Sequence, residues 1–273
     1  MNKTTLYGLL LSALMCGACA PKPQAPELEK DAYGVTTRIN PQEKTVYLVF
    51  TGHFSTDDQG HFENFDGADD VVATLARHGV KGSFFPTGNC FRVDRYQKTL
   101  RDIIDQGHYL SAHSDRHLLL CSYGDRSENY VTADSLARDI AHMEAELNKL
   151  GLTKAQYQWM IPPYEHYNQF SADQLRALGY QLANPTPGLV TGMDWMGPEH
   201  PSYHSAEQLL ENIWNFEKEH TLNGAILLVH AMDYPDRTDE DRLYTHLDEI
   251  IERLKSLGYD FKTFHDVLAA QKS

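Results

Sequence analysis

Apolar and polar positions follow two alternating periods along the chain, and this pattern predicts strands and helices in turn. Short apolar runs rich in β-branched and aromatic residues, typical of buried strands, occupy 45–50, 83–85, 108–112, 157–161, 180–184 and 225–229. Segments with apolar residues at helical spacing separate them and predict helices over 66–78, 96–106, 134–150, 171–178, 205–220 and 239–257. The clearest helix is 134–150, and Gly151 stands where its C-terminal cap is expected.

This order of elements predicts an α/β fold with a mainly parallel sheet, because parallel strands are joined by helical crossovers. Strand–helix units without an internal repeat fit a single distorted (β/α) barrel of about seven parallel strands. An open doubly wound sheet is the alternative. No GxGxxG turn follows the first strand, at 45–50, which weakens a dinucleotide-binding interpretation.

The N-terminus has the layout of an export signal. An apolar run over 6–15 is too short to span a bilayer, and small residues then lead to Cys19. This pattern predicts a bacterial lipoprotein signal over 1–18, with Cys19 lipidated and the protein anchored to the membrane of the cell envelope. A plain secretory signal cleaved near Ala20 is the alternative.

Downstream of the signal the chain is expected to have two parts. Residues 19–40 open with a stretch rich in proline and charge and are predicted to be a tether. Residues 41–273 are long enough for one catalytic domain. Cys90 and Cys121 are the cysteines of that part, and the sequence leaves open whether they form a disulfide or remain free thiols.

The charge of the chain excludes one class of partner. The formal net charge is −14 at pH 7, whereas proteins that bind nucleic acid present a basic surface to the phosphates. No nucleic-acid partner is therefore expected.

Polar side chains follow four of the predicted strands at their C-terminal ends. The groups are His53 after 45–50, the run His113-Ser-Asp-Arg-His117 after 108–112, the run Pro162-Pro-Tyr-Glu165 after 157–161, and His230 after 225–229. In a (β/α) barrel these strand ends meet at one edge and build the active site. Two histidines four residues apart can point the same way and hold one metal ion. The sequence therefore predicts a single site that contains a metal.

These residues carry a resemblance to the polysaccharide deacetylase family, the NodB-homology domain. The run 113–117 resembles the family's HSxxH metal pair, 162–164 the end of its RxPY loop, and 228–230 its late LxH motif. Residues 79–88 resemble its second strand and 258–264 its closing strand. The resemblance extends from about residue 45 to residue 268 and implies a metal-dependent carbohydrate deacetylase.

The chain departs from the family pattern at two places. Phe50-Thr-Gly-His53 stands where the family has paired aspartates, so the metal-binding Asp and the Asp general base are missing from their usual positions. Ile161 stands in place of the RxPY arginine, which in the family orients that base. Without the aspartate, the arginine would be a buried, unpaired charge. Loss of the aspartate therefore accounts for loss of the arginine.

A third metal ligand is then needed beside His113 and His117. His53 is favoured, because neutral imidazole suits zinc as well as carboxylate does and because it lies at the end of a rigid strand. Asp57 and Asp58, in the polar loop that follows, are the alternatives. The expected ion is a divalent metal, with zinc favoured.

Deacetylation needs an activated water, a polarised carbonyl and a proton donor for the leaving amine. A zinc with three protein ligands supplies the first two, and His230 is the expected general acid. The resemblance implies that the backbone N–H of Tyr164 helps to hold the oxyanion. Glu165 and Asp194 are the candidates for the general base; Asp194 lies in a Gly-Met-Asp-Trp run similar to the family's Asp-Trp motif.

Three functions remain open from the sequence. The favoured one is removal of N- or O-acetyl groups from a carbohydrate by a zinc-dependent enzyme of the cell envelope. The others are a catalytically inactive relative that binds glycan, which the loss of the aspartates keeps open, and a related metal-dependent amide hydrolysis. Loop aromatics that could stack on sugar rings are Tyr123, Trp195, Tyr203 and Tyr234. The loop 235–241 is given no role.

Overall fold

The computed structural model describes residues 25–54 and 64–272. Seven strands form a curled sheet in the order β1-β2-β8-β3-β4-β5, with β9 also paired with β3, and β6 and β7 form a second sheet. The strands are β1 Leu28–Lys30, β2 Thr36–Ile39, β3 Thr45–Gly52, β4 Ser83–Pro86, β5 Tyr109–Leu110, β6 Trp159–Met160, β7 Gln181–Leu182, β8 Ala225–His230 and β9 Asp260–Phe261. All pairs from β3 onward are parallel, whereas β1–β2 and β2–β8 are antiparallel.

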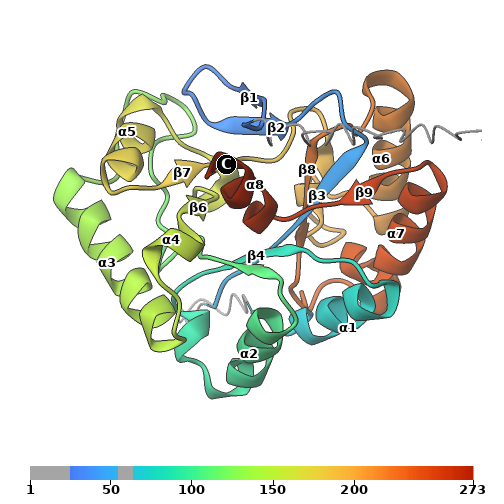
Figure 1. The fold of residues 1–273 in the computed structure, drawn as a ribbon, viewed down its shortest axis with the longest axis horizontal. Coiled ribbons are helices and arrows are strands. Elements are labelled where there is room, and N and C mark those ends of the chain that lie inside the picture. The colour runs from blue at the N-terminus through green and yellow to red at the C-terminus, as the bar shows by residue number, and fades with distance from the viewer. Residues whose placement is uncertain (1–24, 55–63, 273) are drawn as a thin grey trace, which may run out of the picture.

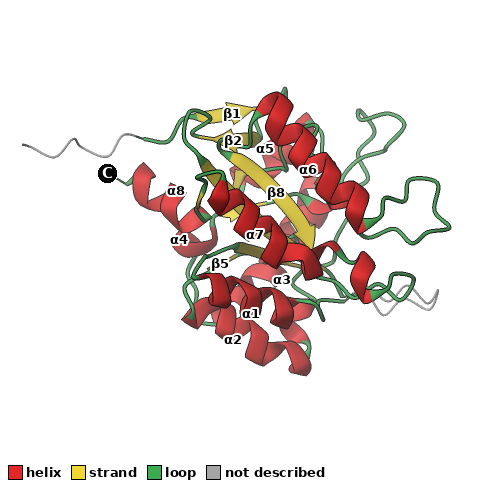
Figure 2. Cartoon of the chain, turned by 90° about the vertical axis from the view of Figure 1, so that its right-hand side faces the viewer, coloured by secondary structure: helices red, strands yellow, loops and turns green. Residues whose placement is uncertain are grey.

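Helices surround the strands as an outer ring (Figure 1), and Figure 2 shows α1, α2 and α7 along one side of it. The α-helices are α1 Ala68–His78, α2 Gln97–Asp105, α3 Ala133–Lys149, α4 Lys154–Tyr157, α5 Gln169–Ala177, α6 Ala206–His220, α7 Leu247–Ser256 and α8 Phe264–Gln271. The predicted distorted barrel of mainly parallel strands is confirmed.

The first two strands lie within 19–40, the segment assigned to a tether from the sequence. β1 pairs with β2, and β2 pairs with β8 through Arg38 and Ala225. Val35 and Ile39 are fully buried. From Leu28 onward the segment is therefore part of the folded domain, in contrast to the prediction, because its apolar side chains join the core. The predicted signal over 1–18 and Cys19 lie outside the described residues.

β3 is buried on both faces. Tyr47 and Val49 face the inside of the barrel, whereas Leu48 and Phe50 face the layer beneath the helices. Successive side chains of a strand point to opposite faces, so a strand covered on both sides is apolar at every position. The unbroken apolar run at the start of the domain reflects this two-sided burial.

α8 fills the N-terminal end of the barrel. It crosses the centre of the ring of helices (Figure 1), and its Phe264, Val267 and Leu268 belong to the inner core. β9, which precedes it, pairs with Thr45 and Val46 at the start of β3. The carboxyl ends of the parallel strands therefore lie at the opposite end of the barrel.

Side-chain hydrogen bonds join β5 to β6. The hydroxyl of Tyr109 donates to the carbonyl oxygen of Trp159 at 3.0 Å and accepts from its backbone N–H at 2.9 Å. The hydroxyl of Ser111 donates to the carbonyl oxygen of Tyr157 at 2.9 Å. These bonds hold the loop after β5 beside the loop after β6.

The predicted helix over 239–257 is interrupted. Asp239–Asp241 and Leu243–His246 are short 3₁₀ turns, and α7 begins only at Leu247. Arg242 separates them in an extended conformation, with φ −88° and ψ 120°. Its side chain bonds Asp239 and the carbonyl oxygen of Tyr234. These local bonds compete with a continuous helix.

Cys90 and Cys121 are both buried free thiols. Burial raises the pKa of Cys90 to about 12, so this thiol is protonated and unreactive at neutral pH. Within residues 25–54 and 64–272, no helix is both long and apolar enough to cross a membrane.

The buried His108 predicts an acid-sensitive fold. Its Nδ1 accepts a hydrogen bond from the backbone N–H of Gly82 at 3.1 Å, and burial, with the charge of Lys81, lowers its pKa to about 4. Below pH 6.5 the imidazole of His108 binds a proton in the unfolded chain but stays neutral in the folded chain down to about pH 4. The free energy of unfolding should therefore fall between pH 6.5 and 4, by about 3 kcal/mol at most.

Chemical denaturation of His108→Asn at several pH values tests this expectation. The Asn oxygen replaces Nδ1 as an acceptor but does not titrate, so the variant should lose much of the pH dependence in this window. His142→Asn, at an exposed histidine of α3, should keep the dependence of the parent chain. If the free energy of unfolding of His108→Asn depends on pH as strongly as that of the parent chain, His108 is not the group responsible.

Candidate active site

Four histidines lie at the carboxyl edge of the parallel strands. β3 leads into His53, β5 leads into the loop of His113 and His117, and β8 ends at His230. In the sheet, Thr51 of β3 pairs directly with His230. The topology thus brings together groups that lie up to 177 residues apart in the sequence.

The three histidines predicted as metal ligands lie side by side. The ring centroids of His53 and His117 are 4.2 Å apart, and those of His113 and His117 are 5.0 Å apart. His53 is 7% exposed and His113 is 2% exposed. The alternative ligands Asp57 and Asp58 lie outside the described residues.

The backbone fixes the tautomer of His113. Its Nδ1–H donates to the carbonyl oxygen of Ile161 at 2.7 Å, because a carbonyl oxygen can only accept. Nε2 then carries a lone pair when the ring is neutral, and it lies 3.4 Å from Oε1 of Glu165. Oε1 is buried and has no hydrogen-bond partner. Two acceptors that face each other in this way leave room for a proton or a cation between them.

Tyr164 packs against His117. Their rings stack with centroids 4.0 Å apart, and the backbone N–H of Tyr164 donates to Nε2 of His117 at 3.4 Å. Nδ1 of His117 is buried without a hydrogen-bond partner. The N–H expected to hold an oxyanion is therefore directed toward the histidine cluster.

The backbone is strained around these side chains. Ser114, His117, Tyr164 and Glu165 have φ values of 66°, 55°, 58° and 51°. Left-handed conformations are costly for residues other than glycine, and such strain concentrates at functional sites. Here it lies in the two loops that carry the predicted site residues.

The imidazoles suppress one another's protonation. Burial lowers the pKa of His53 well below its usual value, and the nearby charges of His230 and His113 lower it further. Burial also lowers the pKa of His117, with contributions from His53, His113 and His230. His53 and His117 are therefore neutral near pH 7, the form in which imidazole binds a metal.

The donor set fits a divalent metal in composition, although the side chains do not converge on one point. In the part of the chain that the structure describes, no three His, Cys, Asp or Glu side chains are arranged to share an ion as they stand. Binding would need rotation of imidazole rings. The unbonded Nδ1 of His117 and Oε1 of Glu165 favour such a change, because buried polar atoms normally have partners.

His230, which is partly buried, forms a pair with the buried Asp194. Oδ1 of Asp194 accepts from Nδ1–H of His230 at 2.6 Å, and Oδ2 accepts from the backbone N–H of His230 at 2.9 Å. This bond places the ring proton on Nδ1 and leaves Nε2 for proton exchange. Asp194, a predicted base candidate, thus acts as the partner of His230.

A family profile described as polysaccharide deacetylase matches residues 38–183, just over half of the chain. The chain belongs to the polysaccharide deacetylase family. The resemblance inferred from the sequence motifs is thereby confirmed, and with it the expectation of a carbohydrate deacetylase-type hydrolase.

Relatives and solved structures agree with this assignment. A peptidoglycan N-acetylmuramic acid deacetylase of Bacillus subtilis is 27% identical over 234 residues, which cover 84% of this chain and 73% of the relative. A peptidoglycan N-acetylglucosamine deacetylase has a similar fold, with a TM-score of 0.61, 20% identity and coverage of 82% of this chain and 88% of that one. A family 4 carbohydrate esterase pseudoenzyme from Bacillus anthracis also reaches 0.61, with 19% identity and coverage of 85% and 68%.

Packing explains why no carboxylate follows Phe50 in the position of the deacetylase family's paired aspartates. A Cβ added to Gly52 would lie 2.4 Å from Cδ2 of Phe65. Phe65 is 1% exposed, and its ring contacts Tyr96 edge-on at 6.0 Å. The preceding Thr51 is also buried. The space beside Gly52 that a metal-binding aspartate would need is therefore filled by an aromatic ring.

Ile161 serves the site through its backbone. Its side chain is fully buried in the inner core of the barrel, where an arginine would be a desolvated charge without a partner. Its carbonyl oxygen still orients His113. The backbone of Ile161 thus orients His113 although its side chain is apolar.

An ionic network around Asp115, in the loop of His113 and His117, was missed from the sequence. Arg92 donates to both carboxylate oxygens of Asp115, at 2.8 and 3.1 Å, and Asp139 of α3 accepts from the backbone N–H of Asp115 at 2.8 Å. Asp115 lies between His113 and His117. The sequence shows an acidic residue, Asp115, between the two histidines, and this was the available signal. The sequence does not show that Arg92 and Asp139 of α3 are its partners.

The loop aromatics differ in exposure. Tyr123 is 63% exposed and Trp195 is 41% exposed. The Tyr123 ring lies 4.3 Å from that of His166. Tyr203 instead donates its hydroxyl to Asp241 at 2.9 Å, and Tyr234 is only partly exposed. Tyr123 and Trp195 therefore remain available to contact a ligand.

The close contact of Gly52 with Phe65 predicts that even one added methyl group is costly. Gly52→Ala should lower the free energy of unfolding by about 1–3 kcal/mol, the usual cost of overpacking. Gly124→Ala is the control, because its Cβ would have no neighbour closer than 3.8 Å. Denaturant titrations measure both changes.

A double-mutant cycle tests the cause. If Phe65 is responsible, the penalty of Gly52→Ala should shrink in a Phe65→Leu background. An equal penalty in both backgrounds, or no penalty at all, would show that the ring does not exclude a side chain at position 52.

Proposed function

We propose that this chain is a metal-dependent deacetylase that removes acetyl groups from a glycan of the cell envelope. The observation that carries the proposal is the proximity of three histidines at one barrel edge, beside a fourth that Asp194 holds in one tautomer. Family membership supplies the reaction type. The names of its relatives make an N-acetylated sugar of peptidoglycan the proposed substrate class.

His53, His113 and His117 would hold the metal, and zinc is the ion that this set favours. Catalytic zinc sites use three protein ligands and keep one open position. Neutral imidazoles leave the charge of the ion uncompensated, and a bound zinc supplies Lewis acidity and a water of lowered pKa. The lowered pKa values of His53 and His117 support this assignment.

His230 is the proposed general acid. Its Nδ1–H is held by Asp194, so Nε2 is the atom that would deliver a proton to the leaving amine. The carboxylate stabilises the positive charge of the ring when both nitrogens are protonated. Asp194 is accordingly assigned as a positioning residue instead of a general base.

Glu165 is then the proposed base, and Tyr164 the proposed oxyanion donor. Oε1 of Glu165 lies 3.4 Å from Nε2 of His113. Its carboxylate therefore lies beside the histidine cluster, where it can accept a proton. The N–H of Tyr164 points toward the same cluster. A donor fixed by a strained turn is preorganised to bind developing negative charge.

Tyr123 and Trp195 are the proposed sugar-contacting aromatics. Tyr123 is held against His166, which is itself fixed by Arg126 and by the carbonyl oxygen of Ser122. An exposed ring that is already ordered can stack on a pyranose at a low entropic cost. We further propose that Cys19 carries a lipid that keeps the domain at the cell envelope.

A catalytically inactive glycan-binding protein is the second candidate. Gly52, with Phe65 packed against it, leaves no aspartate at the family's metal-binding position, and one structural neighbour is a pseudoenzyme of carbohydrate esterase family 4. Bound metal and glycan without turnover would favour this function.

Each of the three proposed ligands should be needed for metal binding. His53→Ala, His113→Ala and His117→Ala should each lower zinc affinity by more than the roughly 10–100-fold that loss of a supporting contact costs. Elemental analysis after dialysis against buffered zinc measures occupancy. His220→Ala, at an exposed histidine of α6, should bind as the parent chain does, and full occupancy in His53→Ala would transfer the third ligand to another residue.

Acetate release from a panel of N- and O-acetylated glycans, with and without chelator, tests the function itself. The parent chain should release acetate in a metal-dependent manner. His230→Ala should retain metal and lose about 10²–10⁴-fold in kcat, the usual worth of a placed proton donor. The loss should be larger for amides than for esters, because an ester's leaving group needs less protonation.

Three outcomes would contradict the proposed activity or one of its residue roles. No turnover on any acetylated glycan supports the inactive relative. Undiminished kcat in His230→Ala removes the general acid. Release of ammonia or a free amine without acetate indicates a different amide hydrolysis.

A further inference from the structure

The loop after β8 contains an arginine that is almost completely buried. Arg237 is 3% exposed, and all five of its N–H donors have acceptors. Nε donates to the carbonyl oxygen of Met196 at 2.8 Å. Nη1 donates to the carbonyl oxygen and Oδ2 of Asp241 at 2.6 and 3.2 Å. Nη2 donates to the carbonyl oxygens of His204 and Met193 at 2.6 and 3.4 Å.

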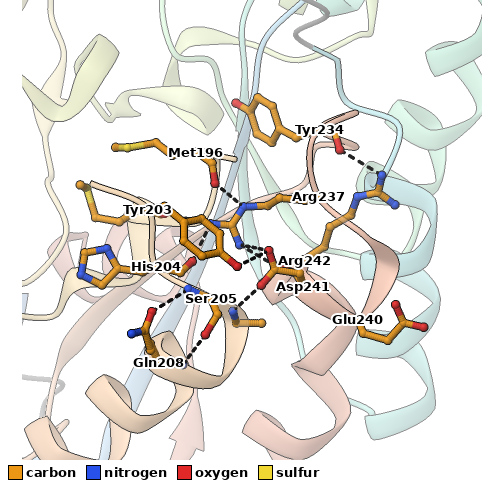
Figure 3. A network of polar contacts seen from close by, with 12 residues as sticks. Met196, Tyr203, His204, Ser205, Gln208, Tyr234, Arg237, Glu240, Asp241 and Arg242 are labelled. Carbon is orange, nitrogen blue, oxygen red and sulfur yellow. Dashed lines mark hydrogen bonds and ion pairs between the residues drawn. The ribbon is translucent and has the colours of Figure 1, made fainter. Parts of the chain in front are cut away.

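These acceptors belong to separate segments, as Figure 3 shows around Arg237. Asp241 extends the network: its Oδ1 accepts from the backbone N–H of Ala206 at the start of α6, and its Oδ2 accepts from the hydroxyl of Tyr203, each at 2.9 Å. The guanidinium also lies over the ring of Tyr203, with 4.9 Å between Cζ and the ring centroid. Its positive charge is thus neutralised within a fully bonded network.

Two of the acceptors bracket Asp194. Met193 precedes it and Met196 follows it by two residues, and both give their carbonyl oxygens to the same guanidinium. Asp194 itself follows a single 3₁₀ turn, Val190–Met193. Its carboxylate makes two hydrogen bonds to His230, which lies seven residues before Arg237 in the chain.

We propose that Arg237 is a positioning residue that fixes the Asp194 loop against the loop after β8, and thereby sets the geometry of the Asp194–His230 pair. The planar fork of an arginine can bind several carbonyl oxygens at fixed angles, which an ammonium group cannot do. The inference rests on the proposed role of His230. Arg237 does not contact substrate in this assignment.

Arg237→Lys is the main test, because it keeps the charge and removes the fork. The first readout is the proton NMR signal of the His230 Nδ1–H in the hydrogen bond to Asp194, identified by its loss in His230→Gln. In folded Arg237→Lys this signal should disappear or broaden through faster exchange. The second readout is kinetic: kcat should fall about 10–100-fold, the usual cost of losing a contact that supports a site residue, while KM changes little.

Arg242→Lys is the matched control. Arg242 lies in the same loop, but its side chain bonds Asp239 and the carbonyl oxygen of Tyr234 and lies 3.9 Å from Asp233. Among the described residues, none of these partners belongs to the Asp194 segment. It should keep both the NMR signal and kcat. If Arg237→Lys does not fold, Tyr203→Phe, which removes one bond to Asp241, should give a smaller change of the same kind.

The NMR readout does not require turnover, so it separates this inference from the proposed activity. An unchanged His230 signal in folded Arg237→Lys, or in Tyr203→Phe where that is the variant that folds, would overturn the positioning role even if the chain is an active deacetylase. A lost signal with no deacetylation in the parent chain would retain the positioning role and reject the activity. Equal losses in Arg237→Lys and Arg242→Lys would show only a general loosening of the loop and would also overturn the proposal.

Discussion

Parallel pairing of β3 with β8 and β4 is the constraint on which the site depends. It sets the ends of these strands at one edge, so that His53 and His230 approach each other, and β5 adds the loop of His113 and His117 through its pairing with β4. The side chains of β3 are buried on both faces, so a slip of its register would disturb the core as well as the site. Core packing and site geometry are therefore secured by the same strand.

The departures from the polysaccharide deacetylase pattern form a consistent set. Phe65 fills the space beside Gly52, Ile161 joins the apolar interior where the family has an arginine, and His53 follows directly after Gly52. A buried arginine without its carboxylate would be destabilising, whereas an isoleucine packs. Beside these positions, Asp194 remains paired with His230 through two hydrogen bonds.

Local patterns predicted the barrel, most of its helices and the strand ends that carry His53, His113, Tyr164 and His230, because two-sided burial and helical spacing leave clear periodic signals. Features that depend on distant partners were not predictable. The pairing of β2 with β8, the support of Asp115 by Arg92 and the bonds of Arg237 all join residues far apart in sequence or in irregular loops. The polar run 235–241 carried no periodic signal, yet it contains Arg237, whose five N–H donors all have acceptors.

We propose that His53, His113 and His117 hold the metal in place of the family's aspartate-containing ligand set. Crystals of the protein grown with zinc, measured on both sides of the zinc absorption edge, test it most directly. One strong anomalous peak is expected, bonded to nitrogen atoms of His53, His113 and His117 at about 2.0–2.1 Å, with His230 still paired with Asp194. A peak coordinated by other residues, or none at this edge of the barrel in zinc-saturated crystals, would contradict it.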